Sequence, residues 1–392
     1  MRILHTCEVY KPSLGGVQEV ISQISKRLVS LGHEVTVATS ADPTRTSSEI
    51  DGVRVEGFSV RGNAVRGMSG EVGRYRDFVV GGDFDVVMMY AAQQWSVDAL
   101  LPILSSISAR RVIATCGFSG LGRRSYRGYF SSLRDSLKEF DSVVLHSAIY
   151  KDARFIEEMG YRRAVVIPNG ADEESFQGPK AAGLRGNFRK LLGIDLDTPL
   201  LILVGSHTGL KGHTAAMRAF GLADTMRGGV LVVLGNSPSR LGCSQICAVH
   251  GPVANLIHRD RRVVLLDSHR DIVISAFLDA DLLLMTSRIE CSPIVLFEAA
   301  AAGLPFIAND VGNAAEIAAW TGAGEVLAGI RGFRQTKRAD VRTFAQEIDR
   351  LWRDPERRWR LHESGEAAFR ERFTWEAITL QYERLYQGLL GE

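Results

Sequence analysis

The feature that most constrains the fold of this chain is the alternation of short apolar runs with helix-length segments. Such runs predict parallel β-strands joined by crossover helices, because strands buried on both faces are almost continuously apolar. The runs fall into two sets. The first set is Arg2–Cys7, Glu34–Thr39, Asp85–Tyr90, Arg111–Cys116, Ser142–Leu145 and Ala164–Ile167. The second set is Leu200–Val204, Val230–Leu234, Arg262–Leu266, Asp281–Met285 and Pro305–Ala308.

The two sets of runs predict two α/β domains. A chain of 392 residues exceeds what one hydrophobic core usually serves. Residues 177–198, rich in Gly, Pro and charge, are interpreted as the linker between an N-terminal Rossmann-like domain (residues 1–176) and a C-terminal one (residues 199–372). Residues 373–392 have the pattern of a capped amphipathic helix. Doubly wound sheets bind ligands at the carboxyl ends of their strands, so we expect the functional residues there.

The composition is that of an ordinary globular protein and narrows the choice of partners. Hydrophobic residues make up 45% of the chain and charged residues 23%, and the formal net charge is +2. A charge so close to neutral argues against nucleic acid as a partner. The first apolar run is interrupted by His5 and Glu8, which is not the pattern of a signal peptide. Since no segment has the ~20 apolar residues of a membrane span, we expect a cytoplasmic protein and leave open a peripheral contact with the inner face of the membrane.

Cysteine usage predicts reduced thiols and no metal centre. The cysteines are odd in number and scattered, which is not the pattern of a disulfide framework. Cys243 and Cys247 are four residues apart, but no second Cys/His pair stands near them in the sequence to complete a zinc site. The full set is Cys7, Cys116, Cys243, Cys247 and Cys291.

Two junctions between a predicted strand and a helix carry residues suited to phosphate. Gly15–Gly16 would let the backbone approach a phosphate at a helix N-terminus, although a plain turn explains the pair equally well. In the C-terminal half, Val204–Ser206 is followed by Lys211 and Gly212. A lysine above the carboxyl edge of a sheet suits a pyrophosphate, and an exposed lysine near a helix cap is the alternative.

The most informative segment is Ser287–Pro305. Glu290 precedes a predicted helix whose first turn contains Pro293, a residue favoured at that position. Glu298 lies within this apolar helix, where a carboxylate is costly to bury without partners. Sugar and ribose hydroxyls are suitable partners because a carboxylate accepts several hydrogen bonds. The amides of Ile294–Val295 would face a diphosphate, and two chance surface glutamates are the alternative.

Taken together, these motifs resemble the family 4 retaining glycosyltransferases, whose fold is called GT-B. The resemblance covers nearly the whole chain and rests on motifs in matching order and spacing. It implies two Rossmann-like domains that face a central cleft, with a C-terminal helix over residues 373–392 that crosses back to the N-terminal domain. The motifs are the Gly15–Gly16 turn, Pro168-Asn169-Gly170 with Asp172, Lys211–Gly212, and Glu290 with Glu298.

The resemblance also implies a role for each matched residue. Glu290 would bind hydroxyls of the donor sugar and Glu298 the ribose. Lys211 would neutralise the diphosphate leaving group, and Gly16 would help to close over the phosphates. Lys211 and Glu290 are the expected catalytic residues. The expected donor-binding set is Gly15, Gly16, Gly205, Ser206, Lys211, Glu290, Ser292, Ile294, Val295 and Glu298.

Two positions depart from the family pattern. Ser206 stands where the family often has an arginine, so His207, His213 or Arg288 would have to supply that charge. Cys116-Gly117 stands where the family has a strand-end His-Gly near the donor sugar. Cys116 and His207 are therefore the candidates for contact with the sugar, and both departures bear on which donor sugar is bound.

The function implied by the resemblance is transfer of a hexose from a nucleoside diphosphate sugar to an acceptor hydroxyl, with retention of configuration and without metal or cofactor. The expected acceptor is a glycan or a lipid-linked molecule of cell-envelope or exopolysaccharide assembly. A catalytically weak nucleotide-sugar-binding protein and a GT-B epimerase or hydrolase remain as alternatives. The basic, aromatic stretch over residues 123–138 would suit an anionic lipid or a phosphorylated acceptor, although a solvated helix face explains it as well.

Overall fold

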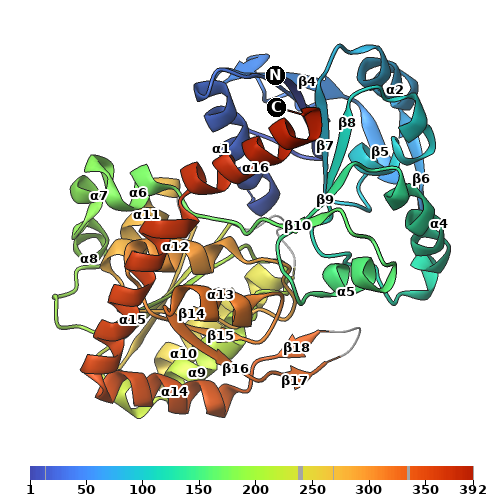
Figure 1. Ribbon diagram of the computed structural model, residues 1–392. Helices are drawn as coiled ribbons and strands as arrows, with labels where there is room; N and C mark the ends of the chain where they lie inside the picture. Colours follow the sequence, from blue (N-terminus) through green and yellow to red (C-terminus); the bar gives the residue numbers. More distant parts are fainter. Residues whose placement is uncertain (14, 237–241, 268, 333–335, 392) are drawn as a thin grey trace. The chain divides into compact units, whose positions relative to one another are not determined.

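The chain is organised in two units, each with its own sheet and its own hydrophobic core. The computed structural model describes residues 1–13, 15–236, 242–267, 269–332 and 336–391 (Figure 1). Unit 1 consists of Met1–Asn169 and Trp375–Glu392, and unit 2 consists of Gly170–Thr374. Each unit is built on a parallel sheet flanked by helices, which confirms the prediction of two Rossmann-like domains.

Unit 1 contains a sheet in the order β10-β9-β8-β7-β1-β2-β4-β3, in which only the β3–β4 pair is antiparallel. The central strand β7 is buried along its whole length, as expected for a strand covered on both faces. A separate hairpin, β5 (Val60–Asn63) and β6 (Gly67–Gly70), follows β4. The strands of the sheet are β1 (Arg2–Thr6), β2 (Glu34–Ser40), β3 (Glu49–Ile50), β4 (Val53–Phe58), β7 (Val86–Tyr90), β8 (Arg110–Ala114), β9 (Ser142–Leu145) and β10 (Ala164–Val166).

The C-terminal helix α16 (Trp375–Leu390) belongs to unit 1, as predicted. It packs against α1, and the Tyr386 hydroxyl lies 3.2 Å from His5 Nε2. Glu383 Oε1 lies 2.8 Å from His33 Nε2. The remaining helices of unit 1 are α1 (Gly16–Ser30), α2 (Val72–Gly81), α3 (Trp95–Asp98), α4 (Arg127–Lys138) and α5 (Lys151–Glu158), with 3₁₀ turns at Leu101–Ser106 and Arg124–Tyr126.

Unit 2 contains a wholly parallel sheet in the order β13-β12-β11-β14-β15-β16. From β11 the chain first builds outward through β12 and β13, and then returns to place β14 on the other side of β11. The strand order therefore reverses between β11 and β14. The strands are β11 (Leu200–Val204), β12 (Val230–Leu234), β13 (Arg262–Leu266), β14 (Leu282–Met285), β15 (Phe306–Asn309) and β16 (Gly324–Leu327), with a hairpin of β17 (Ile330–Arg331) and β18 (Lys337–Arg338).

The helices of unit 2 cover both faces of this sheet (Figure 1). A π-helical turn at Phe369–Phe373 leads from the last of them toward α16. The helices of unit 2 are α6 (Glu173–Gln177), α7 (Pro179–Leu184), α8 (Asn187–Leu192), α9 (His213–Leu222), α10 (Cys243–Ile257), α11 (Arg270–Asp279), α12 (Ile294–Ala302), α13 (Ala314–Thr321), α14 (Val341–Arg353) and α15 (Pro355–Ala368), with a 3₁₀ turn at Asp224–Met226.

Residues 177–198 are not the linker that the sequence suggested, because most of them form α7 and α8 within unit 2. The buried guanidinium of Arg189 donates to the carbonyl oxygen of Asp279 at 3.0 Å and to Asp281 Oδ2 at 2.9 Å. Gly186 and Gly193 adopt left-handed conformations at the two ends of α8. The glycines and charges of this segment therefore serve helix caps and a buried ion pair.

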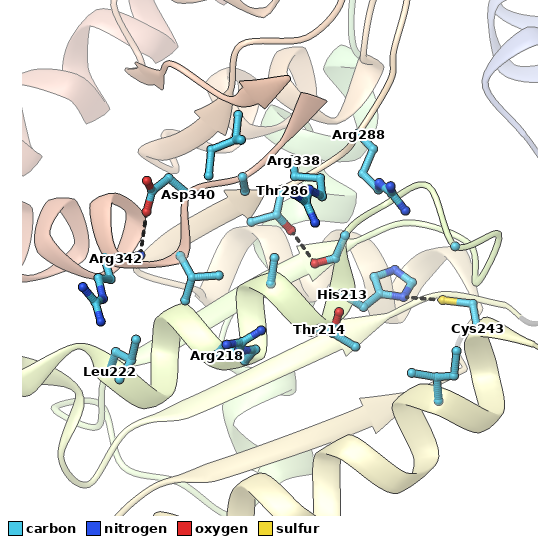
Figure 2. A pocket seen from close by; sticks show the side chains of 17 residues that line it. His213, Thr214, Arg218, Leu222, Cys243, Thr286, Arg288, Arg338, Asp340 and Arg342 are labelled. Carbon is cyan, nitrogen blue, oxygen red and sulfur yellow. Dashed lines mark hydrogen bonds between the residues drawn. The ribbon is translucent and has the colours of Figure 1, made fainter. Parts of the chain in front are cut away.

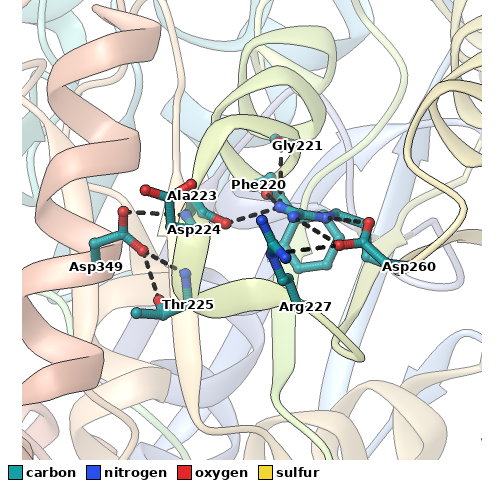
Figure 3. Close-up of polar contacts among 9 residues, drawn as sticks. Phe220, Gly221, Ala223, Asp224, Thr225, Arg227, Asp260 and Asp349 are labelled. Atoms are coloured by element: carbon teal, nitrogen blue, oxygen red, sulfur yellow. Dashed lines mark hydrogen bonds and ion pairs between the residues drawn. The ribbon is translucent and has the colours of Figure 1, made fainter.

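Polar groups fix the end of α9, the helix that begins just after Lys211. Asp349 of α14 accepts hydrogen bonds from the amides of Asp224 and Thr225 at 3.1 and 2.8 Å (Figure 3). Arg261 Nη1 donates hydrogen bonds of 2.8–3.0 Å to three carbonyl oxygens, those of Phe220, Gly221 and Ala223. These bonds satisfy backbone groups that a helix end leaves without intrahelical partners.

Replacing Asp349 with alanine should lower the free energy of unfolding by about 1–2 kcal/mol, or roughly 2–6 °C in Tm. Burial acts to raise the pKa of Asp349, but hydrogen bonds from Thr225 and Asp224 outweigh it and hold the pKa below its usual range. A carboxylate with a lowered pKa contributes stability at neutral pH that is lost as the pH falls through that pKa. In thermal melts at about pH 7 and about pH 3, the Tm difference between Asp349→Ala and wild type should be smaller at the lower pH.

The control for this prediction is Glu356→Ala, which removes a carboxylate with 80% of its side chain exposed, on the neighbouring helix. It should leave Tm almost unchanged. A Tm loss for Asp349→Ala that is the same at both pH values would contradict the role given to its charge.

Candidate active site

The predicted residues of the C-terminal half gather at the carboxyl edge of the unit 2 sheet. Gly205 and Ser206 follow β11, Lys211 lies just before α9, and Glu290 follows β14. Strands β11 and β14 are the neighbours between which the strand order reverses. Doubly wound sheets bind ligands in the crevice at this point.

Lys211 and Glu290, 79 residues apart in sequence, form an ion pair. Lys211 Nζ donates to Glu290 Oε1 at 2.6 Å. The lysine side chain is 31% exposed and the glutamate side chain 14%, so water still reaches the pair. The structure thus brings the two predicted catalytic residues together, with the lysine charge balanced by the carboxylate.

Close backbone contacts hold the Lys211 loop against the end of β14. Gly212 has a φ of +73°, and a Cβ there would lie 2.0 Å from the carbonyl oxygen of Thr286. Thr286 Oγ1 donates to the carbonyl oxygen of Gly212 at 3.0 Å, and the amide of Arg288 donates to that of Leu210 at 2.7 Å. A side chain at residue 212 would push the two loops apart, so the glycine fixes the position of Lys211.

Gly312 packs closely against the segment between Glu290 and the start of α12. This glycine has a φ of +62°, and a Cβ there would lie 2.3 Å from the carbonyl oxygen of Cys291. The amide of Asn313 donates to the same oxygen at 2.9 Å. Ser292 and the first helical residues, Ile294–Val295, are half-buried, and first-turn amides of a helix have no intrahelical acceptor. The amino end of α12 therefore points donors toward the carboxyl edge of the sheet.

Glu298 is 4% exposed and forms an ion pair with Arg270, the first residue of α11. The guanidinium of Arg270 also lies over the ring of Phe176, 5.9 Å from its centroid. Sequence reasoning missed Arg270. The signal that could have found it is its place just after β13, which puts it at the same edge of the sheet as Glu290 after β14.

His207 and His213 do not supply the charge that Ser206 lacks. Burial lowers the pKa of His207, against a weaker opposite effect of Asp267, and burial lowers the pKa of His213 to about 4. Both imidazoles are therefore neutral near pH 7. Arg288, whose Nε is buried without a hydrogen-bond partner among the described residues, remains the candidate for that charge.

Cys243 and Cys247 have no second Cys/His pair beside them in the sequence, but the fold supplies one. Folding brings His207 and His213 to the two cysteines, and His213 stands 30 residues before Cys243 in the sequence. None of the five cysteines, all of which lie in the described part of the chain, forms a disulfide bond. The sequence spacing hides the cluster because the loop after β11 and the start of α10 meet only in the folded unit.

A cavity of about 980 Å³ lies along α9, beside His213 and Thr214 (Figure 2). Its walls include His213, Thr286 and Arg288, and the guanidinium groups of Arg338 and Arg342. None of the predicted donor-binding residues lines it. The cavity is therefore distinct from the predicted donor-binding set, and of the candidates for the missing charge it is lined by Arg288 and His213.

Unit 1 carries its own pocket, of about 450 Å³, at the carboxyl ends of its strands. Cys116, after β8, lines it together with Glu8, Gln93 and Arg66. Four non-glycine residues near it have positive φ angles, namely Ala91, Gln93, Cys116 and Phe118. Such strained backbone costs about 1–3 kcal/mol per residue and clusters at functional sites. The Gly15–Gly16 turn lies in the same unit, where α1 begins at Gly16.

No helix within the described ranges is both long and apolar enough to span a membrane.

Two doubly wound domains, one with a lysine–carboxylate pair at its switch point, define an α/β protein of the GT-B type. Residues 185–368 match the family described as "Glycosyl transferases group 1", and residues 14–175 match "Glycosyltransferase Family 4". The chain belongs to the family 4 glycosyltransferases.

The similarity to known proteins, in sequence and in structure, covers nearly the whole chain. The N-acetyl-alpha-D-glucosaminyl L-malate synthase of Bacillus anthracis is 23% identical over 97% of this chain and 96% of that protein. The sucrose-phosphate synthase of Thermosynechococcus elongatus superposes with a TM-score of 0.78 at 18% identity and covers 100% of both chains. HepE from Anabaena, solved in complex with UDP, superposes with a TM-score of 0.75 at 19% identity over 99% of this chain and 100% of that one.

Proposed function

We propose that this protein is a retaining hexosyltransferase that moves a sugar from a UDP-sugar to an acceptor hydroxyl, in cell-envelope or exopolysaccharide assembly. The observation that carries the proposal is the Lys211–Glu290 pair at the switch point of unit 2. Glu298 is buried on α12, the helix that follows Glu290, and belongs to the same proposed site. UDP is chosen because a protein of the same fold has been solved with UDP.

The chemical task is to stabilise the charge that forms when the bond between the anomeric carbon and the diphosphate oxygen breaks. The electron pair leaves with the diphosphate, and Lys211 and the amides of Ile294–Val295 would stabilise that charge. Glu290 would hold hydroxyls of the donor sugar, and Glu298 the ribose. Gly205 and Ser206 would line the phosphate path. The acceptor proton passes to the departing phosphate, so the protein needs no base of its own.

Binding of the donor requires Lys211 to exchange partners. In the structure its ammonium group is held by Glu290 Oε1. A diphosphate carries more negative charge than one carboxylate, so it can draw the lysine away. The Glu290 carboxylate can then accept hydrogen bonds from the sugar. The ion pair therefore keeps both groups ordered until a donor replaces it.

For the acceptor we propose the pocket of unit 1. Its lining combines hydrogen-bonding groups with the positive charges of Arg66 and Arg123. This mixture suits a hydroxylated molecule that also carries phosphate, such as a lipid-linked glycan. Cys116 lies in the wall of this pocket, so its contact would be with acceptor or sugar hydroxyls.

The transfer should proceed without a divalent ion at the reacting centre. The chain has three Asp-x-Asp sequences, Asp83–Asp85, Asp195–Asp197 and Asp279–Asp281, and each stands before a strand, at its amino end. They are therefore at the opposite edge of each sheet from the proposed sites. Turnover is expected to gain nothing from added Mg²⁺ or Mn²⁺. An assay in which Mn²⁺ restores activity lost in EDTA would contradict this.

The proposed function is tested by a donor panel of UDP-, GDP-, ADP- and TDP-sugars, with binding followed by calorimetry and turnover by release of the nucleoside diphosphate. We expect binding and slow turnover with one or more UDP-sugars. Binding without turnover toward any acceptor would instead identify a nucleotide-sugar-binding protein. Failure of the whole panel to bind would overturn the proposal.

A further inference from the structure

Four potential metal ligands meet beside the Lys211 loop, outside the proposed donor site. His207 and His213 stand on either side of Lys211 in sequence, and Cys243 and Cys247 lie on the first turns of α10. One ligand atom from each of the four side chains lies within 4.8 Å of all the others. Figure 2 shows the His213 ring directed at the sulfur of Cys243.

The distances match the edges of a zinc tetrahedron. With Zn–S and Zn–N bonds of about 2.3 and 2.0 Å, those edges are about 3.8 Å between two sulfurs and about 3.5 Å between sulfur and nitrogen. The two sulfurs of Cys243 and Cys247 are 3.9 Å apart. Both lie 3.6 Å from His213 Nδ1, and Cys243 Sγ lies 3.9 Å from His207 Nδ1.

Neither a disulfide nor simple hydrogen bonds explain this arrangement as well. A disulfide needs a sulfur–sulfur distance of about 2.05 Å, far below the 3.9 Å found between Cys243 and Cys247. The single in-plane lone pair of His213 Nδ1 accepts one hydrogen bond, yet two thiols approach it at the same 3.6 Å distance. Equal distances to several atoms are typical of ligands arranged around a common centre.

The orientation of His213 is fixed in the way that metal-binding histidines require. Its Nε2 donates to the carbonyl oxygen of Gly205 at 3.0 Å, which leaves the Nδ1 lone pair facing the two sulfurs. Such a second hydrogen bond sets the tautomer and the ring orientation of a metal ligand. His213 and Cys247 are buried, while His207 and Cys243 are half-buried, so the cluster lies just beneath the surface.

We propose that His207, His213, Cys243 and Cys247 bind one Zn²⁺ ion, which ties the start of α10 to the loop that carries Lys211. Two sulfur and two nitrogen ligands in a tetrahedron favour zinc over harder cations. Zinc would bind with loss of the two thiol protons, and two thiolates balance its charge. Four protein ligands leave no open position for substrate, so the ion has a structural role. This role is separate from the sugar transfer proposed above.

The test is Co²⁺ titration of the metal-free wild-type chain, prepared without a histidine tag and under reducing conditions. Cobalt takes the same tetrahedral site and reports thiolate ligands through a sulfur-to-cobalt charge-transfer band. We expect one Co²⁺ per chain, this band together with tetrahedral d–d bands, and their loss when an equal amount of Zn²⁺ is added. Absence of the charge-transfer band in the wild type would overturn the proposal.

Variants assign the band to the four residues. Cys243→Ser/Cys247→Ser should abolish it, and His213→Gln should weaken or shift it. His250→Gln is the matched control, because His250 is an exposed histidine on the same helix, outside the cluster. A band that persists in the double cysteine variant would place the metal elsewhere and contradict the proposal. Zinc content of the protein as purified, near one per chain in wild type and near zero in the double variant, gives a second readout that is independent of transferase activity.

Discussion

Replacing Lys211 with alanine is expected to weaken binding of UDP by about 1.5–3 kcal/mol, or roughly 10- to 150-fold. The lysine is the cation that the structure holds at the switch point of unit 2, 2.6 Å from Glu290. Its removal takes a charge-assisted contact from the diphosphate and leaves the Glu290 carboxylate to repel it. Calorimetry with UDP and with the UDP-sugar measures the loss.

Replacing Glu290, the partner of Lys211 in the ion pair, is expected not to weaken the binding of UDP. Glu290→Gln frees the lysine from its competing carboxylate, so UDP should bind as tightly as in wild type or more tightly. Sugar transfer should nevertheless fall, because an amide is a weaker acceptor for the sugar hydroxyls than a carboxylate. Lys180→Ala is the matched control, since Lys180 is a half-exposed lysine of α7 paired with Asp271. Equal UDP affinities for wild type and Lys211→Ala would remove Lys211 from the site.

Replacing Glu298 with alanine should lower both donor affinity and stability. The carboxylate is 4% exposed and paired with Arg270, so its loss removes a largely buried ion pair at the carboxyl edge. Arg270 is 38% exposed and can recover some hydration, so we expect about 1–3 kcal/mol in the free energy of unfolding. The affinity for UDP should fall about 10-fold or more, since two hydroxyls of the ribose lose their acceptor.

Two comparisons separate these effects of Glu298. Thymidine diphosphate lacks one ribose hydroxyl, so the difference in affinity between it and UDP should shrink in Glu298→Ala. The variant Arg270→Ala removes the ion pair but keeps the carboxylate, and it should lower Tm with a smaller loss of affinity. A discrimination between the two nucleotides that Glu298→Ala leaves unchanged would contradict the role of Glu298 in ribose binding.

The apolar strands were predictable because burial on both faces leaves a clear signal in the sequence. Those of unit 2 over Leu200–Val204, Val230–Leu234 and Arg262–Leu266 agree residue for residue with β11, β12 and β13. Two strands at or next to a sheet edge were not predicted. Strand β4 (Val53–Phe58) alternates polar and apolar residues, and β16 (Gly324–Leu327) is half-buried, so neither forms a continuous apolar run.

The proposed donor site was predictable only in part, for a physical reason. Lys211 follows β11, whereas Glu290 and Glu298 follow β14, and a parallel sheet brings the carboxyl ends of neighbouring strands to one edge. Side-chain partners depend on packing that spacing does not encode. Arg270 joins Glu298 from another helix, and His213 meets Cys243 only after α9 and α10 pack on the sheet. The supposed linker was misread because glycine and charge also serve caps and buried ion pairs.

The measurement that tests the central claim most directly is a proton NMR time course of the protein with a UDP-α-sugar and a hydroxyl acceptor or water. We predict that UDP and a sugar product of α configuration appear together, at a rate lowered at least 10-fold in Lys211→Ala and unchanged in Lys180→Ala. The α signal must be read before mutarotation equilibrates any free sugar. A product of β configuration would contradict retention. Full turnover by the Lys211→Ala variant would contradict the site itself.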